Sequence, residues 1–278
     1  MRQKIGMIGF GNMGSAITAI LKAQKSKYEI WVFDKDRLRI NNLFDIKAAE
    51  NNVDLVSRAD IIILAVKPQD FNIVLDEIKD YVQEKLIISI AAGIKTEYTE
   101  KSLGRVRVVR VMPNITAKVG AGITCLAKGK FAAEEDFNFA AELFANLGKT
   151  LRIEEKMMNA ATAVSGSGPA YICEFIEAQS ADIDNISEQK KQAFLDDFQK
   201  AAQAVGFNQE QAGVLVKNTF DGTIEMLKKT GFLPSELKAQ VISKGGTTEA
   251  ALEVLRKGGC LQDAVRAALT RAEELAKK

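Results

Sequence analysis

The sequence contains no histidine, only three cysteines and no long hydrophobic run. Histidine is the commonest general acid or base and a common metal ligand, so its absence leads us to expect no metal site. Cys125, Cys173 and Cys260 are odd in number and widely spaced, which predicts reduced, buried thiols. The longest apolar stretch, 86–94, is too short to cross a bilayer, and a strand expected from residue 4 leaves no room for a signal peptide. We therefore expect a cytoplasmic protein that binds no membrane.

The sequence also lacks an excess of charge of either sign. It has 38 Lys and Arg residues against 36 Asp and Glu residues, a net charge of +2 over 278 residues. Nucleic acids and anionic membranes bind clustered basic charge, so neither is an expected partner. Because single hydrophobic cores rarely grow much beyond about 250 residues, we expect two domains, 1–153 and 154–278.

The sequence does contain a glycine-rich turn of the kind that binds dinucleotides. Gly9-Phe10-Gly11-Asn12-Met13-Gly14 follows an apolar strand expected over 4–8 and opens a helix expected over 12–24. Gly9 permits a tight turn, Gly11 lets the backbone approach a pyrophosphate, Gly14 lets the helix pack on the sheet, and the helix N-terminus attracts the phosphates. Asp34 ends a second strand, 29–33, where an acid that binds the ribose is expected. A structural glycine turn in another α/β domain is the alternative.

The first domain alternates strands and helices, which indicates an α/β fold of the Rossmann type with a mainly parallel sheet. Further strands are expected at 61–66, 86–90, 105–111 and 122–127, and helices at 36–44, 71–81, 96–103 and 133–147. After residue 153 the strand signal ends, and helices are expected at 157–164, 209–229, 247–257 and 261–278. The apolar stripe of the 209–229 helix packs in the core or against a second subunit, so we expect the all-helical domain to form a homodimer.

Loops that follow strands of a parallel sheet form its ligand-binding edge. We therefore expect three such loops to bind the cofactor and to line a trough for the nicotinamide. Lys67 either contacts the ligand or is solvated, and the sequence does not distinguish these two interpretations. The loops consist of Ala65, Val66, Lys67 and Pro68, then Ala92 and Gly93, and then Met112, Pro113 and Asn114.

Two later motifs, Ser165-Gly166-Ser167-Gly168-Pro169-Ala170-Tyr171 and Ser243-Lys244-Gly245-Gly246-Thr247-Thr248, make the chain resemble the pyrroline-5-carboxylate reductase family. The turn at 8–14, the three loops and these two motifs follow the family order over nearly the whole chain. The resemblance implies that NADPH or NADH reduces the cyclic imine 1-pyrroline-5-carboxylate to L-proline, in a homodimer or a larger homo-oligomer.

In the second of these motifs a helix N-terminus flanked by hydroxyls suits a carboxylate. The alternative is that Glu249, in the same first turn, already complements the helix dipole, and the resemblance favours a substrate loop. We expect Ser243, Gly245, Gly246, Thr247 and Thr248 to bind substrate, opposite the nicotinamide trough. Thr248 is the candidate catalytic hydroxyl near the ring nitrogen, because positioning carries most of the rate when a protonated imine is already electrophilic.

The sequence departs from the family at three places and leaves alternatives open. Lys244 replaces a proline, Asn159 replaces an aspartate, and roughly twenty extra residues lie between 183 and 203, by comparison with the family pattern. A reductase of a related cyclic imine, a β-hydroxyacid dehydrogenase and a nucleotide-sensing module are the competing readings. The family generally favours NADPH, but Asp34 suits NADH, and Lys35 and Arg37 have the opposite effect. We therefore expect the protein to use both cofactors.

Overall fold

The computed structural model describes residues 2–23, 27–41, 43–179 and 185–277. The chain divides into two compact units. The first contains 1–112 and 126–155, and the second contains 113–125 and 156–278. The division at 155/156 lies near the predicted boundary at 153/154, but the prediction did not foresee that 113–125 would belong with the helical unit.

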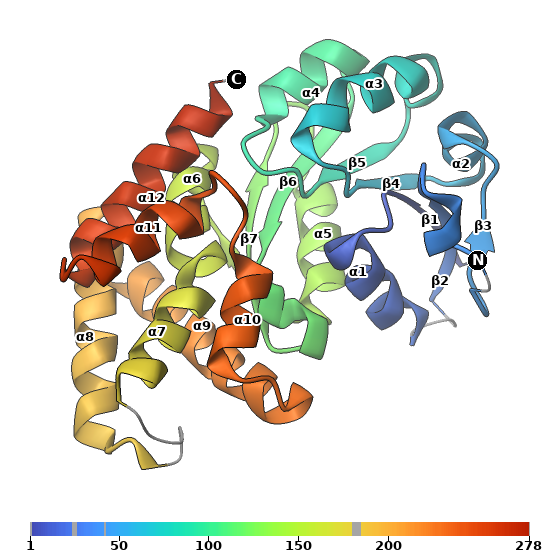
Figure 1. Ribbon diagram of the computed structural model, residues 1–278. Coiled ribbons are helices and arrows are strands. Elements are labelled where there is room, and N and C mark those ends of the chain that lie inside the picture. Colours follow the sequence, from blue (N-terminus) through green and yellow to red (C-terminus); the bar gives the residue numbers. More distant parts are fainter. Residues whose placement is uncertain (1, 24–26, 42, 180–184, 278) are drawn as a thin grey trace. The chain divides into compact units, whose positions relative to one another are not determined.

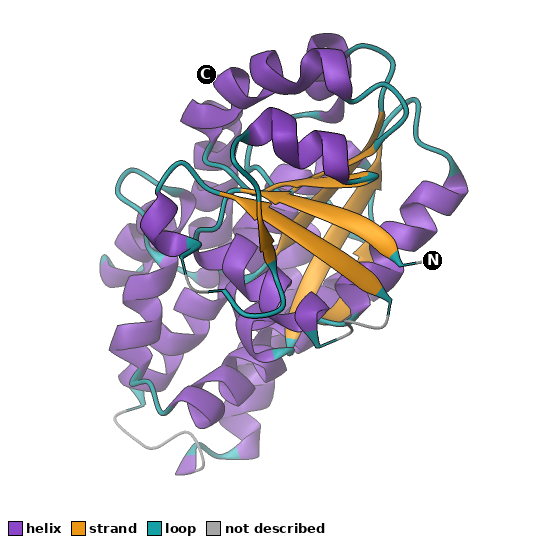
Figure 2. Ribbon diagram, turned by 90° about the vertical axis from the view of Figure 1, so that its right-hand side faces the viewer, coloured by secondary structure: helices purple, strands orange, loops and turns teal. Residues whose placement is uncertain are grey.

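The described residues form one eight-stranded sheet (Figure 2). Strands β1 to β6 pair in parallel, with Ile5 of β1 beside Ile30 of β2 on one side and Ile61 of β4 on the other. The Rossmann-type fold is confirmed. In spatial order the strands are β3 (Lys47–Ala48), β2 (Tyr28–Phe33), β1 (Gln3–Ile8), β4 (Ile61–Leu64), β5 (Leu86–Ser89), β6 (Arg107–Pro113), β7 (Gly122–Lys128) and β8 (Gly148–Arg152).

The central strands are apolar because helices cover both of their faces. All four residues of β4 and all four of β5 are buried. Gly6 in β1 allows the helix at 52–58 to pack closely, because a Cβ atom at this position would collide with the side chain of Leu55. The helices of this unit, seen in Figure 1, are α1 (Asn12–Lys22), α2 (Asn52–Arg58), α3 (Pro68–Ile78), α4 (Thr96–Leu103) and α5 (Glu134–Ala145).

The predicted helix at 36–44 is wrong. The structure has a single 3₁₀ turn, Arg37–Arg39, which the Asp36 side chain caps by accepting the N–H of Leu38. Ile40 is buried, whereas Leu38 and Phe44 are 81% and 82% exposed. A helix over this segment would have had no continuous apolar face to bury. The chain instead continues into β3 and α2, two short elements that the sequence patterns did not predict, like the edge strand β8.

In its described part the second unit has helices and their connections, apart from Pro113 at the end of β6 and the first residues of β7. Helix α11 packs on α12, α10 on α7 and α8 on α9 (Figure 1). The predicted helix at 157–164 is instead a short α6 followed by a π turn, Thr162–Gly166, and the break before Pro169 is where it was expected. The helices are α6 (Met158–Ala161), α7 (Gly168–Ala178), α8 (Glu188–Ala204), α9 (Gln209–Thr230), α10 (Pro234–Val241), α11 (Thr247–Arg256) and α12 (Leu261–Ala276).

Most of the apolar stripe of α9 is buried in the single chain, and Ile224 is half-buried. Leu215, Val216, Phe220 and Leu227 are each at most 8% exposed in the single chain. Phe220 joins a cluster of rings in which Phe194 stacks on Phe175 with centroids 4.5 Å apart. This stripe is therefore core, and it does not by itself call for a second subunit.

Candidate functional site

The glycine-rich turn has the geometry that its sequence predicts. Gly9 has a φ of +95°, and a Cβ atom on it would lie 2.7 Å from the backbone oxygen of Ala65. A Cβ atom on Gly14 would collide with the backbone oxygen of Gly9. Helix α1 begins at Asn12 with Gly11 as its N-cap, so the free N–H groups of its first turn lie at the end of β1. This arrangement is an anion site of the kind that binds a pyrophosphate.

Asp34 is buried at the end of β2, and backbone N–H groups bind both of its carboxylate oxygens. Oδ2 accepts the N–H of Phe10 at 2.6 Å, and Oδ1 accepts the N–H of Asp36 at 2.8 Å. The side chain expected to contact a ribose therefore also holds the middle of the glycine-rich turn. Because an ionised carboxylate has about four acceptor positions, it retains the capacity to accept ribose hydroxyls.

A pocket of about 390 Å³ lies beside this turn in the first unit. Six of the predicted cofactor residues line it: Gly9, Gly11, Asp34, Ala65, Val66 and Lys67. Phe10, Asn12, Met13, Gly14, Pro68, Ala92, Gly93 and Met112 also belong to this unit and are not among the lining residues.

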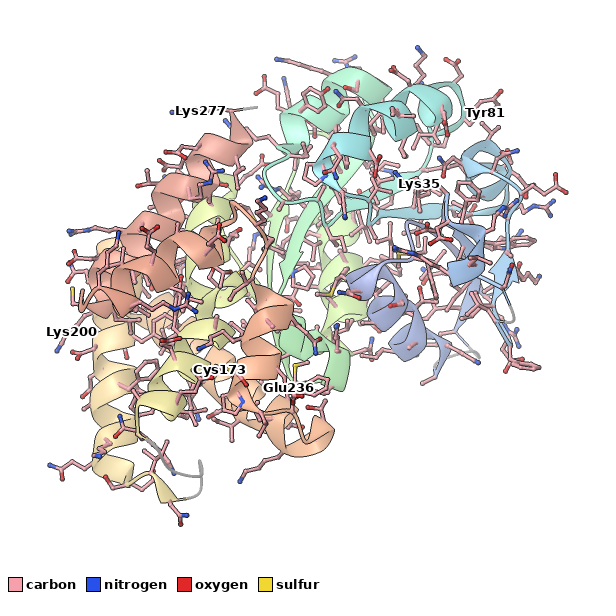
Figure 3. All side chains as sticks on the ribbon, viewed as in Figure 1. Lys35, Tyr81, Cys173, Lys200, Glu236 and Lys277 are labelled. Carbon is pink, nitrogen blue, oxygen red and sulfur yellow. The ribbon has the colours of Figure 1, made fainter. Side chains whose placement is uncertain are left out.

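The cations near Asp34 differ in how they are bound. Lys35, labelled in Figure 3, lines the pocket and forms an ion pair with Asp70 at 2.7 Å. The Arg37 guanidinium donates to the backbone oxygens of Ala49 and Glu50, each at 2.7 Å. Both terminal nitrogens of Arg37 are therefore occupied by backbone carbonyl groups.

Arg39 is a pocket residue that the sequence reasoning missed. It lines the pocket, and its Nη1 would lie 3.5 Å from a Cβ atom built on Gly11. Its Nε donates to Asp36 at 3.1 Å, and this bond does not use the two terminal nitrogens. The charge alternation of 34–39 was the available signal, but it could not show which of the cations turns toward the glycines.

Asn52, the first residue of α2, is a second pocket residue that the sequence reasoning missed. It is 5% exposed, and its Nδ2 donates to Glu77 at 2.7 Å. Among the described residues its Oδ1 has no hydrogen-bond partner. A buried acceptor that lines a pocket and lacks a donor is suited to a hydroxyl or amino group of a ligand.

The two later loops differ in their geometry. Ala92 is exposed and Gly93, with a φ of +77°, is half-buried, so the loop after β5 is accessible at Ala92. Met112 and Pro113 belong to β6 itself and not to a loop, because the strand continues to residue 113. Asn114 has a structural role in the second unit, where its Oδ1 accepts the Thr116 hydroxyl at 2.8 Å and the N–H of Ile123 at 3.2 Å.

The predicted substrate loop forms the N-terminus of α11. Gly245 has a φ of +69°, Gly246 is the N-cap, and a Cβ atom on Gly246 would collide with Ser243 Oγ. The Glu249 carboxylate accepts the N–H of Gly245 at 2.7 Å, and the Gly245 carbonyl accepts from Arg271 Nε at 2.7 Å. The loop is thus held from inside its own unit. Lys244 and Ser243 are exposed.

Hydroxyl groups meet behind this loop. Thr248 is 4% exposed and donates to Ser167 Oγ at 3.0 Å, and Thr247 Oγ1 lies 3.0 Å from the same atom. Nearby, the Tyr171 hydroxyl donates to the Ala163 carbonyl at 3.0 Å, and burial raises the pKa of this phenol. Ser167 lies in one of the motifs that carry the family resemblance, but it was not among the predicted site residues.

The cysteines are free thiols, as expected, but they are not all buried. Burial raises the pKa of both Cys125 and Cys173 to about 12, which makes them poor nucleophiles. The expectation is wrong for Cys260, which is exposed and donates to Asp263 at 3.2 Å. Within the described ranges there is no group of three metal-binding side chains, and no helix combines the length and hydropathy of a membrane span.

A parallel sheet with a glycine-rich turn, a helix N-terminus at its edge and a buried acid after β2 defines a dinucleotide-binding Rossmann protein. Two known families match parts of the chain. Residues 4–93 match "NADP oxidoreductase coenzyme F420-dependent", and 155–183 with 192–275 match "Pyrroline-5-carboxylate reductase dimerisation". The break in the second match, 184–191, falls within the predicted insertion, of which 183 and 184 lie outside the described residues.

Full-length relatives identify the family. The chain is 33% identical to the pyrroline-5-carboxylate reductase of Aquifex aeolicus, covering 100% of this chain and 98% of that one. It is 36% identical to that of Methanosarcina acetivorans, with 99% of both chains covered, and 35% identical to that of Escherichia coli, with 100% and 98% covered. The chain belongs to the pyrroline-5-carboxylate reductase family.

Solved structures agree with this assignment. A Plasmodium falciparum pyrroline carboxylate reductase with NADP bound matches with a TM-score of 0.62 and 29% identity, over 99% of this chain and 98% of that one. A Coxiella burnetii pyrroline-5-carboxylate reductase matches with the same TM-score and 31% identity, over 100% and 98%.

Proposed function

We propose that the protein reduces 1-pyrroline-5-carboxylate to L-proline with NADPH or NADH as the hydride donor. The observation that carries the proposal is the pocket beside the glycine-rich turn, in a chain that matches reductases of this name along its whole length. The reduced nicotinamide supplies a hydride to the imine carbon, and the ring nitrogen keeps its proton and becomes the amine of proline.

The first unit supplies the dinucleotide site in this proposal. The N–H groups at the start of α1 bind the pyrophosphate, and Asp34 and Asn52 bind the ribose and base through their acceptor oxygens. The loops at 65–68 and 92–93 and the end of β6 at Met112 bind the rest of the dinucleotide. Pro113 and Asn114 continue this segment in the second unit.

The second unit supplies the substrate loop. The N–H groups of Thr247 and Thr248 lie in the first turn of α11, where helical N–H groups lack intrahelical acceptors. They suit the substrate carboxylate, together with Ser243, Gly245 and Gly246. The Thr248 hydroxyl, oriented by Ser167, is assigned to the ring nitrogen of the substrate.

The proposal is tested by following reduced nicotinamide absorbance with five-membered and six-membered cyclic imine carboxylates. Faster oxidation with the five-membered imine supports it. Preference for the six-membered ring would indicate a related imine reductase, and oxidation of neither would leave a nucleotide-sensing module.

Replacing Thr248 by alanine tests the catalytic assignment. Turnover should fall by about a hundredfold, the scale for the loss of one positioned hydrogen-bonding group, because the Thr248 hydroxyl donates to Ser167 and accepts the N–H of the protonated imine. The dissociation constant of NADPH should stay the same. Thr248→Ser should retain activity because it keeps the hydroxyl. Thr230→Ala is the matched control, since it removes a hydroxyl that donates to Met226 in the same unit. A parallel loss of cofactor binding in Thr248→Ala would contradict the assignment.

We also propose that the protein is cytoplasmic and forms a homodimer through the helical unit, or a larger homo-oligomer. The match to a dimerisation family supports this assembly, whereas the buried stripe of α9 does not. Sedimentation at micromolar concentration should give a dimer or a larger species. A stable and active monomer would contradict it.

A further inference from the structure

One carboxylate in the first unit, that of Glu155, binds donors from two distant segments. Its oxygens accept the backbone N–H of Thr96 at 2.7 Å, the Thr96 hydroxyl at 2.6 Å and Nη1 of Arg110 at 3.3 Å. Thr96 is 59 residues away in the sequence and Arg110 is 45 residues away. Glu155 therefore links α4 to β6 directly.

At α4 this carboxylate replaces a local cap. The helix begins at Thr96, and the preceding residue, Lys95, has no side-chain acceptor with which to cap it. The Glu155 carboxylate satisfies one of the free N–H groups of the first turn, and its negative charge complements the positive end of the helix dipole. The loop that carries Ala92 and Gly93 therefore runs from β5 to a helix start held by Glu155.

At β6 the same carboxylate faces a buried cation. Arg110 is 5% exposed, and burial lowers its pKa, an effect that Glu155 opposes. In the strand register Arg110 lies beside Ser89, the last residue of β5, and it precedes Met112 by two positions. The ion pair with Arg110 thus connects the Glu155 carboxylate to β6 close to its carboxyl end, beside the last residue of β5.

We propose that Glu155 is a positioning residue for hydride transfer. It fixes the loop at 90–95 and the end of β6 at Met112, two of the segments of the first unit assigned to the nicotinamide. The inference rests on the proposed function, because it assumes that these segments seat the ring. The glycine-rich turn and Asp34 are assigned to the other end of the dinucleotide, so we expect cofactor affinity to depend little on Glu155.

The test replaces Glu155 by glutamine and by aspartate. Glu155→Gln should lower kcat by about tenfold to a hundredfold, the cost expected for a misplacement approaching 1 Å, and KM for the cofactor should stay within about twofold. The kinetic isotope effect on kcat with nicotinamide deuterated at C4 should increase, because the hydride step becomes rate-limiting. Glu155→Asp, which keeps the charge, should recover part of the activity.

Two controls separate positioning from a general loss of structure. Glu134→Gln removes a carboxylate that also binds two cations, Arg152 and Lys128, on the exposed surface, and it should leave kcat unchanged. Thr96→Val removes the shortest of the three bonds while keeping the ion pair, and it should lower kcat in the same direction but less. It keeps the inference testable if Glu155→Gln fails to fold.

Hydrogen exchange provides a readout that does not require activity. Amides of 91–99 should exchange faster in Glu155→Gln, while those of 9–14 should not change. If the wild-type enzyme reduces neither imine, the proposed function fails, and the exchange pattern still decides whether Glu155 fixes this loop. An unchanged kcat and isotope effect, or exchange that increases uniformly over the unit, would overturn the inference.

Discussion

Asp34 gives the sharpest test of cofactor choice, and Asp34→Ser is the substitution to make. Removing its charge takes away the repulsion of a 2′-phosphate and the acceptor of the ribose hydroxyls. Two unit charges 4 Å apart interact by about 4 kcal/mol at an effective dielectric constant of 20 and by about 1 kcal/mol in water. Asp34 is only 8% exposed, so water screens it weakly.

The ratio of kcat/KM for NADPH to that for NADH is the quantity to measure. It should rise about tenfold or more, since about 1.4 kcal/mol corresponds to each factor of ten. Serine also loses the bonds to the N–H groups of Phe10 and Asp36, which should weaken the binding of both cofactors. That common loss cancels in the ratio, so the ratio reports the repulsion of the 2′-phosphate together with the hydrogen bonds to the ribose hydroxyls.

Asp54→Ser is the matched control. Asp54 also accepts a backbone N–H, that of Glu50 at 3.0 Å, but it does not line the pocket. The control should leave the ratio unchanged. If Asp34→Ser also leaves the ratio unchanged at low salt, where screening is weakest, Asp34 does not face the ribose and the reasoning is refuted.

Two further predictions concern charge and pH. Arg39→Gln should lower kcat/KM for NADPH about tenfold and leave kcat/KM for NADH unchanged, because the terminal nitrogens of Arg39 lie at the pocket. Arg37→Gln is the control and should change neither value, because the Arg37 guanidinium is bound to the backbone of Ala49 and Glu50. Equal losses with both cofactors in Arg39→Gln would contradict the assignment. Burial raises the pKa of Cys125 and Cys173 to about 12 from 9.0, so unfolding releases their protons at alkaline pH. The free energy of unfolding from urea titrations should be insensitive to these thiols below pH 9 and fall above it by up to about 1.4 kcal/mol per pH unit for each thiol. Cys125→Ala should remove the contribution of one thiol to this pH dependence. If the pH dependence of the free energy of unfolding above pH 9 does not change in this variant, the Cys125 thiol ionises in the folded protein.

The parts of the fold that the sequence predicted are those set by local patterns. The turn from Gly9 to Gly14 is specified by three glycines within six residues, and α4 begins and ends at the predicted residues. The helix expected at 36–44 was wrong because the burial of Ile40 and the exposure of Leu38 depend on tertiary packing, which the local sequence does not determine.

The connections within the site could not be predicted because they join residues far apart in sequence. The bond from the N–H of Phe10 to Asp34 crosses 24 residues, and that from Thr248 to Ser167 crosses 81. Residue types indicated that Asp34 and Thr248 were candidates. Which hydrogen bonds already occupy them is determined only when the chain folds.

The charges around the dinucleotide pocket have a consequence for the rate at which a cofactor arrives. Three acids, Asp34, Asp36 and Asp70, line the pocket together with three bases, Lys35, Arg39 and Lys67, so the lining is neutral overall. A neutral lining does not focus an electric field on an approaching polyanion, and steering of that kind is what raises association rates strongly at low salt. We therefore expect the association rate constants of NADH and NADPH to be similar and to vary little with ionic strength. Discrimination between the two cofactors would then lie in how long each stays bound.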